Sequence, residues 1–220
     1  MLFEHKSVGN KNKRNYAKRF AKHWLGREAM SKQAKTLTPQ ELRRVLDYVA
    51  TRKHAARNRA MLQMQYLAGL RVGEVANLRY ENVVNAAGEV RAEIRLTAEQ
   101  TKGRHARVVF VSDALAKELR RYIAAVPITN PSAKFFYSQK LTSDGFTANT
   151  LTQHFHYLYK WAGIAGGSSH SGRRTFITNL AAKGVGVRVL MSLAGHLNIS
   201  TTQRYIDVND NMLRSAVELA

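Results

Sequence analysis

The hydrophobic pattern of this chain leaves helical spacing for strand alternation in one region, residues 90–111, and that region constrains the fold more than any other feature. Apolar and polar residues alternate over residues 90–97, which is the pattern of a half-buried β-strand. Residues 107–111 are predicted to be its antiparallel partner, and the polar residues 98–105, with Gly103 near the tip, are predicted to form the hairpin loop. A short third strand is predicted at Phe135–Tyr137.

The rest of the folded part has helical spacing. Thr38, Pro39 and Glu41 supply an N-cap, a proline at the first helical position and the acidic residue of a capping box, so a helix is predicted to begin at Pro39. The next helix, residues 55–68, is apolar on most sides and is therefore predicted to be central and buried. Further helices are expected over residues 72–78, 112–125, 147–162, 171–183, 186–194 and 201–206, and after Asn209. The predicted fold class is α+β, mostly helical, with a small antiparallel sheet of about three strands.

The charge of the chain indicates its partner. The 220 residues include 35 Lys or Arg and 15 Asp or Glu, which gives a formal net charge of +20. Self-repulsion of this size opposes folding, so the charge is expected to serve a polyanion such as double-stranded DNA. The chain has no cysteine, which excludes disulfides, thiolate zinc sites and cysteine nucleophiles. No apolar run approaches a membrane span and no secretory signal is recognised, so a cytoplasmic, nucleoid-associated protein without membrane partners is expected.

The N-terminal residues 1–35 are more basic than the remainder. They contain ten Lys or Arg residues against two acids, Glu4 and Glu28. We interpret them as a basic arm, with a helix around Tyr16–Trp24, ahead of a folded domain over residues 36–220. A solvated tail without a function of its own is the plainer alternative.

Polar residues that suit phosphate chemistry stand at defined spacings. His170 and Arg173 lie three residues apart at the start of a predicted helix and therefore share one face. His196 follows the next helix, and Tyr205 lies nine residues further on. Upstream, Arg71 and Glu74 follow the central helix, and the hairpin loop supplies Lys102.

These segments resemble the catalytic domain of the tyrosine recombinase (phage integrase) family. The resemblance is carried by AGLRVGEVANLR, TKGRHARVVFV and HSGRRTFITNLAAKGVGVRVLMSLAGHLNISTTQRYI, and it covers roughly residues 36–210. It implies a site-specific DNA recombinase that cleaves and rejoins strands through a 3′-phosphotyrosyl intermediate, in integration, excision, inversion or resolution. It implies no cofactor and no metal. The implied partners are double-stranded DNA, further protomers in a tetramer on two DNA sites, and accessory DNA-bending proteins.

The resemblance also implies a role for each site residue. Arg71 and Arg173 would bind the non-bridging phosphate oxygens, because two guanidinium forks stabilise the charge that develops there. His196 would donate a further hydrogen bond, and Glu74 would orient the arginines.

Three further residues would move protons and electrons. Tyr205 would be the nucleophile, His170 would help to accept its proton, and Lys102 would protonate the departing 5′ oxygen. Each has a plainer alternative. The histidines could be structural, and Tyr205 could be an aromatic residue at an interface. Lys102 could belong, with Arg104 and Arg107, to a basic loop that only contacts phosphates.

Several alternatives stay open. The chain could be a catalytically silent DNA-binding regulator on the same fold, or a nicking-closing enzyme like type IB topoisomerases. Residues 208–220 would be either a tether to a neighbouring protomer or a helix on their own domain. Family members usually carry a longer helical core-binding domain ahead of this region, so the chain is either a short member or a fragment. Gly172 stands where the family prefers an apolar residue, at a cost to the helix of up to ~1 kcal/mol.

Overall fold

The computed structural model describes residues 33–126, 130–138, 144–206, 213–214 and 217–218. Backbone contacts divide the chain into Met1–Gln33 and Ala34–Ala220, and all elements below belong to the second unit. The helix predicted at Tyr16–Trp24 and most of the helix predicted after Asn209 lie outside the described residues. Within the described residues, no helix is both long and apolar enough to cross a membrane.

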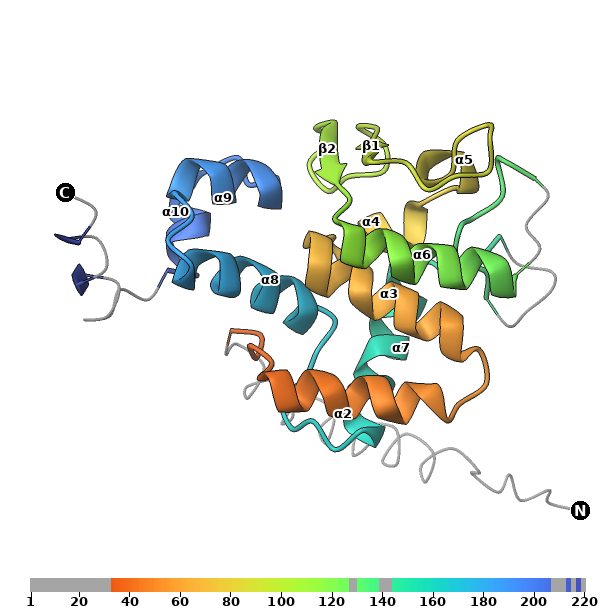
Figure 1. Ribbon diagram of the computed structural model, residues 1–220, viewed down its shortest axis with the longest axis horizontal. Helices are drawn as coiled ribbons and strands as arrows, with labels where there is room; N and C mark the ends of the chain where they lie inside the picture. Colours follow the sequence, from red (N-terminus) through yellow and green to blue (C-terminus); the bar gives the residue numbers. More distant parts are fainter. Residues whose placement is uncertain (1–32, 127–129, 139–143, 207–212, 215–216, 219–220) are drawn as a thin grey trace, which may run out of the picture. The chain divides into compact units, whose positions relative to one another are not determined.

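The described elements are mostly helices, which confirms the predicted fold class (Figure 1). In chain order they are α2 (Pro39–Ala50), α3 (Ala55–Ala68), α4 (Val72–Asn77), α5 (Tyr80–Val83), β1 (Glu93–Leu96), β2 (Arg107–Phe110), α6 (Asp113–Ala125), α7 (Ala148–Trp161), α8 (Ser171–Ala182), α9 (Val187–Ala194) and α10 (Ile199–Gln203). The predicted capping box is present at the start of α2: the Glu41 amide donates to Thr38 Oγ1 at 3.2 Å, and the Thr38 amide donates to Glu41 Oε2 at 3.1 Å. The short helix α5 has no counterpart in the sequence prediction.

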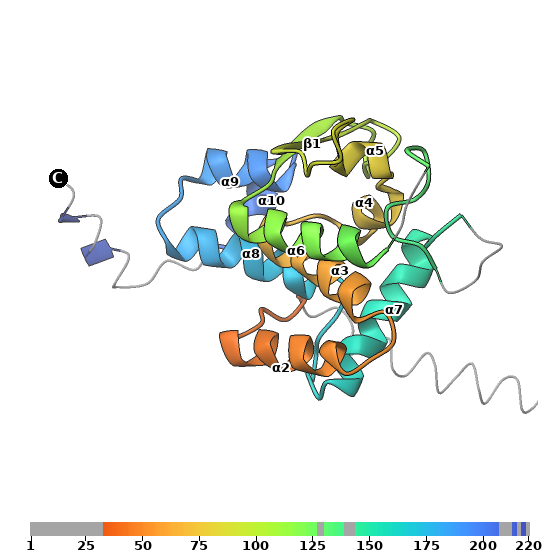
Figure 2. The same cartoon turned by 45° about the vertical axis from the view of Figure 1, so that its right-hand side comes forward.

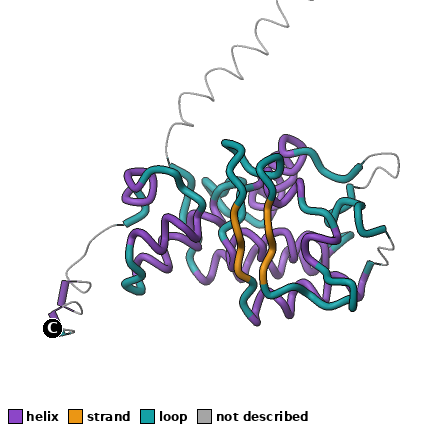
Figure 3. Tube along the Cα trace, turned by 90° about the horizontal axis from the view of Figure 1, so that it is seen from above, coloured by secondary structure: helices purple, strands orange, loops and turns teal. Residues whose placement is uncertain are grey.

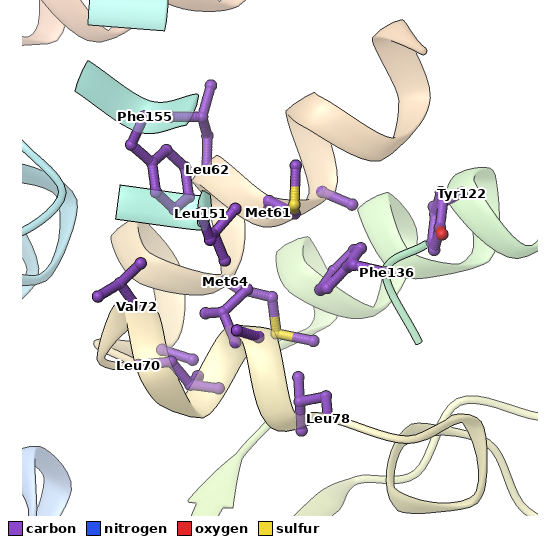
Figure 4. Close-up of a cluster of buried hydrophobic side chains, with 14 of the residues drawn as sticks. Met61, Leu62, Met64, Leu70, Val72, Leu78, Tyr122, Phe136, Leu151 and Phe155 are labelled. Carbon is purple, nitrogen blue, oxygen red and sulfur yellow. The ribbon is translucent and has the colours of Figure 1, made fainter. Parts of the chain in front are cut away.

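Helix α3 is central, as its apolar sequence predicts. It packs against α2, α4, α6 and α8, and Met61, Leu62 and Met64 on it are almost completely buried. Figure 4 shows these side chains among apolar residues from α4, α6, α7 and the segments that flank them. The view in Figure 2 shows α7 next to α2, against which it packs.

The sheet has two strands in the described part of the chain, and the two lie side by side in Figure 3. They are antiparallel, with Ile94 opposite Val109 and Leu96 opposite Arg107. The prediction of a third strand at Phe135–Tyr137 is wrong. Consecutive strand residues point to opposite faces, whereas Phe135 and Phe136 are both buried and both pack on the ring of Tyr122.

A close approach between α3 and α8 explains Gly172. A Cβ at this position would lie 2.9 Å from the Cβ of Gln65, so a side chain would force the two helices apart. Gln65 is fully buried and donates to the Ser169 carbonyl at 2.8 Å, just before α8 begins. The glycine therefore costs helix propensity but permits the packing that brings α8, and with it Arg173, against the end of α3.

Candidate functional site

The C-terminal end of α3 and the start of α4 position the first arginine. Gly69 ends α3 with a left-handed backbone (φ 63°), and Arg71 is the N-cap of α4. The Arg71 guanidinium donates to Glu74 Oε1 at 2.8 Å and to the Gly195 carbonyl at 2.7 Å. It thereby connects α4 to the end of α9, more than a hundred residues further along the chain.

Among the described residues, Glu74 is the one carboxylate that hydrogen-bonds Arg71 and Arg107. Its side chain is 1% exposed, and it also accepts two hydrogen bonds from Arg107, at 2.7 Å and 3.2 Å. Burial by itself would raise the pKa of Glu74, but the hydrogen bonds and charges of Arg107 and Arg71 outweigh it and lower the pKa. The carboxylate is therefore ionised at neutral pH and holds two guanidinium groups.

Arg107, at the start of β2, is a site residue to which the sequence analysis gave no role of its own. Besides holding Glu74, its Nη1 donates to the Leu193 carbonyl at 2.9 Å. The side chain also passes over Gly195, where a Cβ would lie 2.5 Å from Arg107 Cδ. The sequence showed only a basic hairpin loop, and nothing local distinguished Arg107 from Arg104.

Arg173, on α8, connects the ends of two other helices. Its side chain donates to the Gly69 carbonyl at 2.5 Å and to the Ala194 carbonyl at 2.6 Å, and the residue is 4% exposed. These carbonyls lie at the C-terminal ends of α3 and α9, where no further helical turn can satisfy them. Burial and the charge of Arg71 lower the pKa of Arg173 to about 9, so it stays charged at neutral pH.

His196 completes what we call the arginine cluster: Arg71, Glu74, Arg107, Arg173 and His196. Its Nε2 lies 2.9 Å from Arg173 Nη2, and its Nδ1 lies 2.9 Å from Thr202 Oγ1. Because a guanidinium can only donate, Nε2 is the acceptor and Nδ1 carries the proton that is donated to Thr202. Burial and the charge of Arg173 lower the pKa of His196 to about 4, which agrees with a neutral ring.

Tyr205 lies beside this cluster, two residues beyond α10. Its ring stacks on His196, with centroids 5.7 Å apart and an interplanar angle of 23°. The guanidinium of Arg174 lies over the same ring, 5.1 Å from its centroid. In Figure 1, α8, α9 and α10 lie together and α8 lies next to α3; α8 packs against both α3 and α9, and α9 packs against α10.

His170 and Lys102 are placed differently. His170 is the exposed N-cap residue of α8, and Lys102 is exposed in the turn between β1 and β2. In the described part of the chain, neither side chain hydrogen-bonds to the arginine cluster. His170 nevertheless lies close enough to the cluster for its pKa to be affected. Burial lowers the pKa of His170 most, and the positive charges of Arg173, Lys102 and Arg71 lower it further.

The arrangement has the chemistry of an anion site with a tyrosine at its edge. The site holds three guanidinium groups and one carboxylate, which binds only Arg71 and Arg107, so an excess of positive charge surrounds Arg173 and His196. Within the described ranges, no group of three or more His, Asp or Glu side chains is placed to hold a metal ion. The fold and the site together define the class of this protein. It is an α+β protein in which the ends of several helices meet at an arginine-rich anion site.

Comparison with known proteins identifies the family. Residues 35–212 match the phage integrase family, so the chain belongs to it and the resemblance found in the sequence is confirmed. The tyrosine recombinase XerA of Pyrococcus furiosus is 28% identical over 186 residues, and that of Thermococcus kodakarensis is 32% identical over 192 residues. In each case the match covers 84% of this chain and 62% of the relative, so the chain spans less than two thirds of their length.

Solved structures agree with the fold. A crystal structure of XerA recombinase superposes with a TM-score of 0.67 at 26% identity, covering 86% of this chain and 64% of that one. The XerH site-specific recombinase bound to its difH substrate before cleavage has a TM-score of 0.59 at 21% identity, covering 86% and 55%. This second likeness concerns the fold alone.

Proposed function

We propose that the chain is a site-specific DNA recombinase of the tyrosine type, which cuts and rejoins double-stranded DNA. One observation carries the proposal: the ring of Tyr205 lies on His196, which is hydrogen-bonded to Arg173 within the arginine cluster. A phenol next to a cationic anion site suits attack on a phosphodiester. The names of the XerA relatives support the same assignment.

The scissile phosphate would bind at Arg71 and Arg173. Glu74 and one backbone carbonyl hold the Arg71 guanidinium, and two backbone carbonyls hold that of Arg173, so the fold itself fixes both positions. Preorganised donors of this kind need no reorganisation when charge develops on the phosphate oxygens. Arg107 would act through Glu74, as a positioning residue for Arg71.

The reaction would proceed by transesterification. The Tyr205 oxygen attacks phosphorus, the bond from phosphorus to the 5′ oxygen breaks, and the DNA 3′ end is joined to the protein. The phenol proton would pass to His170, whose lowered pKa leaves the ring neutral and able to accept it. Lys102 would give a proton to the 5′ oxygen. Attack by another 5′ hydroxyl reverses these steps and rejoins the strands without a cofactor or metal.

His196 has a more specific role in this scheme than the sequence indicated. Its Nε2 accepts a hydrogen bond from Arg173, so this nitrogen carries no proton to donate. A bound phosphate would compete with His196 for the Nη2 group of Arg173. Donation to the phosphate by Nε2 would then require loss of that hydrogen bond and a shift of the ring proton from Nδ1 to Nε2, with the Thr202 hydroxyl donating to Nδ1 instead.

The wider organisation is part of the same proposal. Residues 36–220 would be the catalytic domain, and residues 1–35 a basic arm that adds sequence-independent phosphate contacts. Recombination of two duplexes would need four protomers on two DNA sites, with residues 208–220 as a tether between neighbours. Accessory DNA-bending proteins would assist, in the cytoplasm at the nucleoid.

The test is formation of a covalent adduct with nicked DNA. The full chain is incubated with a pool of nicked duplexes whose sequence around the nick is random, and adducts are resolved on a denaturing gel and sequenced. The wild-type protein should form an adduct, and Tyr205→Phe should form none while retaining DNA binding. Binding without any adduct would favour the silent regulator, and an adduct with Tyr205→Phe would place the nucleophile elsewhere. Relaxation of supercoiled plasmid without strand exchange would favour the topoisomerase-like alternative.

A further inference from the structure

Arg174 is next to Arg173 on α8, but it points to a different target. Its guanidinium lies over the Tyr205 ring, with Cζ 5.1 Å from the centroid. Its Nε donates to Thr36 Oγ1 at 3.1 Å. A planar cation is attracted to the negative face of an aromatic ring, and arginine can make this contact while its N–H groups stay hydrogen-bonded elsewhere.

Thr36 is itself held against α8. The amide of the following residue, Leu37, donates to Thr175 Oγ1 at 2.8 Å, and Leu37 is 4% exposed. Thr175 is fully buried and donates to the Ser171 carbonyl at 2.7 Å. The backbone that carries the Thr36 hydroxyl is thus held next to the helix that carries Arg174, which restricts where the guanidinium can lie.

Few other restraints on Tyr205 are found within the described residues. Its amide donates to the Thr202 carbonyl at 3.0 Å, and its ring stacks on His196 and makes a cation–π contact with Arg174. No hydrogen bond of its hydroxyl group occurs within the described residues. The direction of the phenol is therefore set by ring contacts, and small errors in the direction of attack slow a displacement strongly.

We propose that Arg174, anchored by Thr36, is a positioning residue that holds the Tyr205 ring for attack. This inference rests on the proposed function, in which Tyr205 is the nucleophile. Arg174 does not join the arginine cluster, because its contacts run to Thr36 and to the ring. Its removal should slow the attack by Tyr205 without weakening the binding of the phosphate.

The test measures single-turnover adduct formation on a nicked duplex recovered from the pool. Arg174→Gln keeps much of the length of the side chain but removes the cation, and it should lower the rate about tenfold. Arg174→Lys keeps a cation without the planar fork and should recover part of the loss. Lys183→Gln, which removes one positive charge at the exposed C-terminal end of the same helix, is the matched control and should keep the wild-type rate.

Two further measurements separate positioning from a structural role. DNA affinity, measured in the Tyr205→Phe background, should be the same for the Arg174→Gln and Lys183→Gln variants. Thr36→Val, which removes only the hydroxyl, should slow adduct formation by itself and have no further effect when Arg174 is already Gln, because the two residues act in series.

A sulfur leaving group identifies the step that is affected. With a 5′-bridging phosphorothiolate, departure needs no general acid, so the defect of Lys102→Ala should shrink while that of Arg174→Gln persists. An unchanged or faster rate for Arg174→Gln, or a loss of folding or binding that accounts for the slower rate, would overturn the inference and leave the proposed function intact. Absence of any adduct with the wild-type protein would overturn both.

Discussion

The arginine cluster and the turn that carries Lys102 hold their side chains in opposite ways. In the cluster, charged side chains from the start of α4, from β2 and from α8, with the neutral ring of His196 two residues after α9, hydrogen-bond one another and the ends of α3 and α9. Lys102 is exposed at a turn with Gly103 beside it at φ 92°. The difference matches the two tasks we propose. A phosphate site profits from fixed donors, whereas a general acid must reach the leaving group only when DNA is bound.

Breaking the cluster at its carboxylate should have the largest effect. Glu74→Gln removes the charge that Arg71 and Arg107 share, leaving guanidinium groups without compensation in a buried site. We expect a loss of about 3 kcal/mol in the free energy of unfolding, measured by urea denaturation. Glu118→Gln is the matched control, because its pair with Arg59 is partly exposed and should contribute less than about 1 kcal/mol. Equal losses would show that the cluster is not a special source of stability.

Removing Lys102 should affect chemistry and leave stability unchanged. Lys102→Ala is expected to lower the rate of adduct formation about a hundredfold, which is the usual contribution of a general acid. The free energy of unfolding should change by less than about 0.5 kcal/mol, since the side chain is exposed and makes no hydrogen bond that the described residues reveal. The matched variant Arg104→Ala, two residues along the same turn, should retain most of the rate. If Arg104→Ala is as slow, the turn only contributes positive charge.

The smallest effect concerns pH. The folded protein lowers the pKa of His196 from 6.5 to about 4, so the unfolded chain binds a proton more readily between these values. Stability linked to His196 is therefore complete above pH 6.5 and is lost as the pH falls toward 4. Since the ring is half-buried, we expect a contribution of about 1 kcal/mol to the difference between pH 7 and pH 4.

The pH prediction is checked by urea denaturation at both pH values. His196→Gln should reduce the difference in stability, and the same change at exposed His156 should leave it as in the wild type. A difference that His196→Gln does not reduce would show that His196 is not held neutral by the cluster. Glu74 contributes with the same sign at lower pH, because its lowered pKa adds stability that is lost on acidification.

Most of the secondary structure followed from local signals. The capping box at Thr38 and the helices predicted over residues 55–68 and 147–162 are read from neighbouring residues, and the structure agrees with them to within one residue at each end. The prediction of a third strand is wrong because it relied on the high β-propensity of aromatic residues, which is the same wherever they occur. At Phe135 and Phe136 burial against Tyr122 decided the backbone instead.

The candidate site was predicted as a set of residue types, and the structure adds how they are connected. Arg71, Glu74, Arg173, His196 and Tyr205 were singled out from motif spacing, and they lie together. The sequence pattern does not indicate a role for Arg107 or Arg174, because each is one basic residue among several in its segment. Only their contacts in the folded protein distinguish them: Arg107 binds Glu74, and Arg174 contacts Thr36 and Tyr205.

The sequence by itself determined the helical pattern, the hairpin, the basic charge and membership of the phage integrase family, because these depend on neighbours along the chain or on motif spacing. The tertiary structure decided which nitrogen of His196 carries the proton, why Gly172 is tolerated, and which arginine holds Glu74 and which covers Tyr205. Those features join residues from distant parts of the chain. Their hydrogen bonds and ring contacts form only when packing brings helix ends within a few ångströms, a condition that local pattern does not encode.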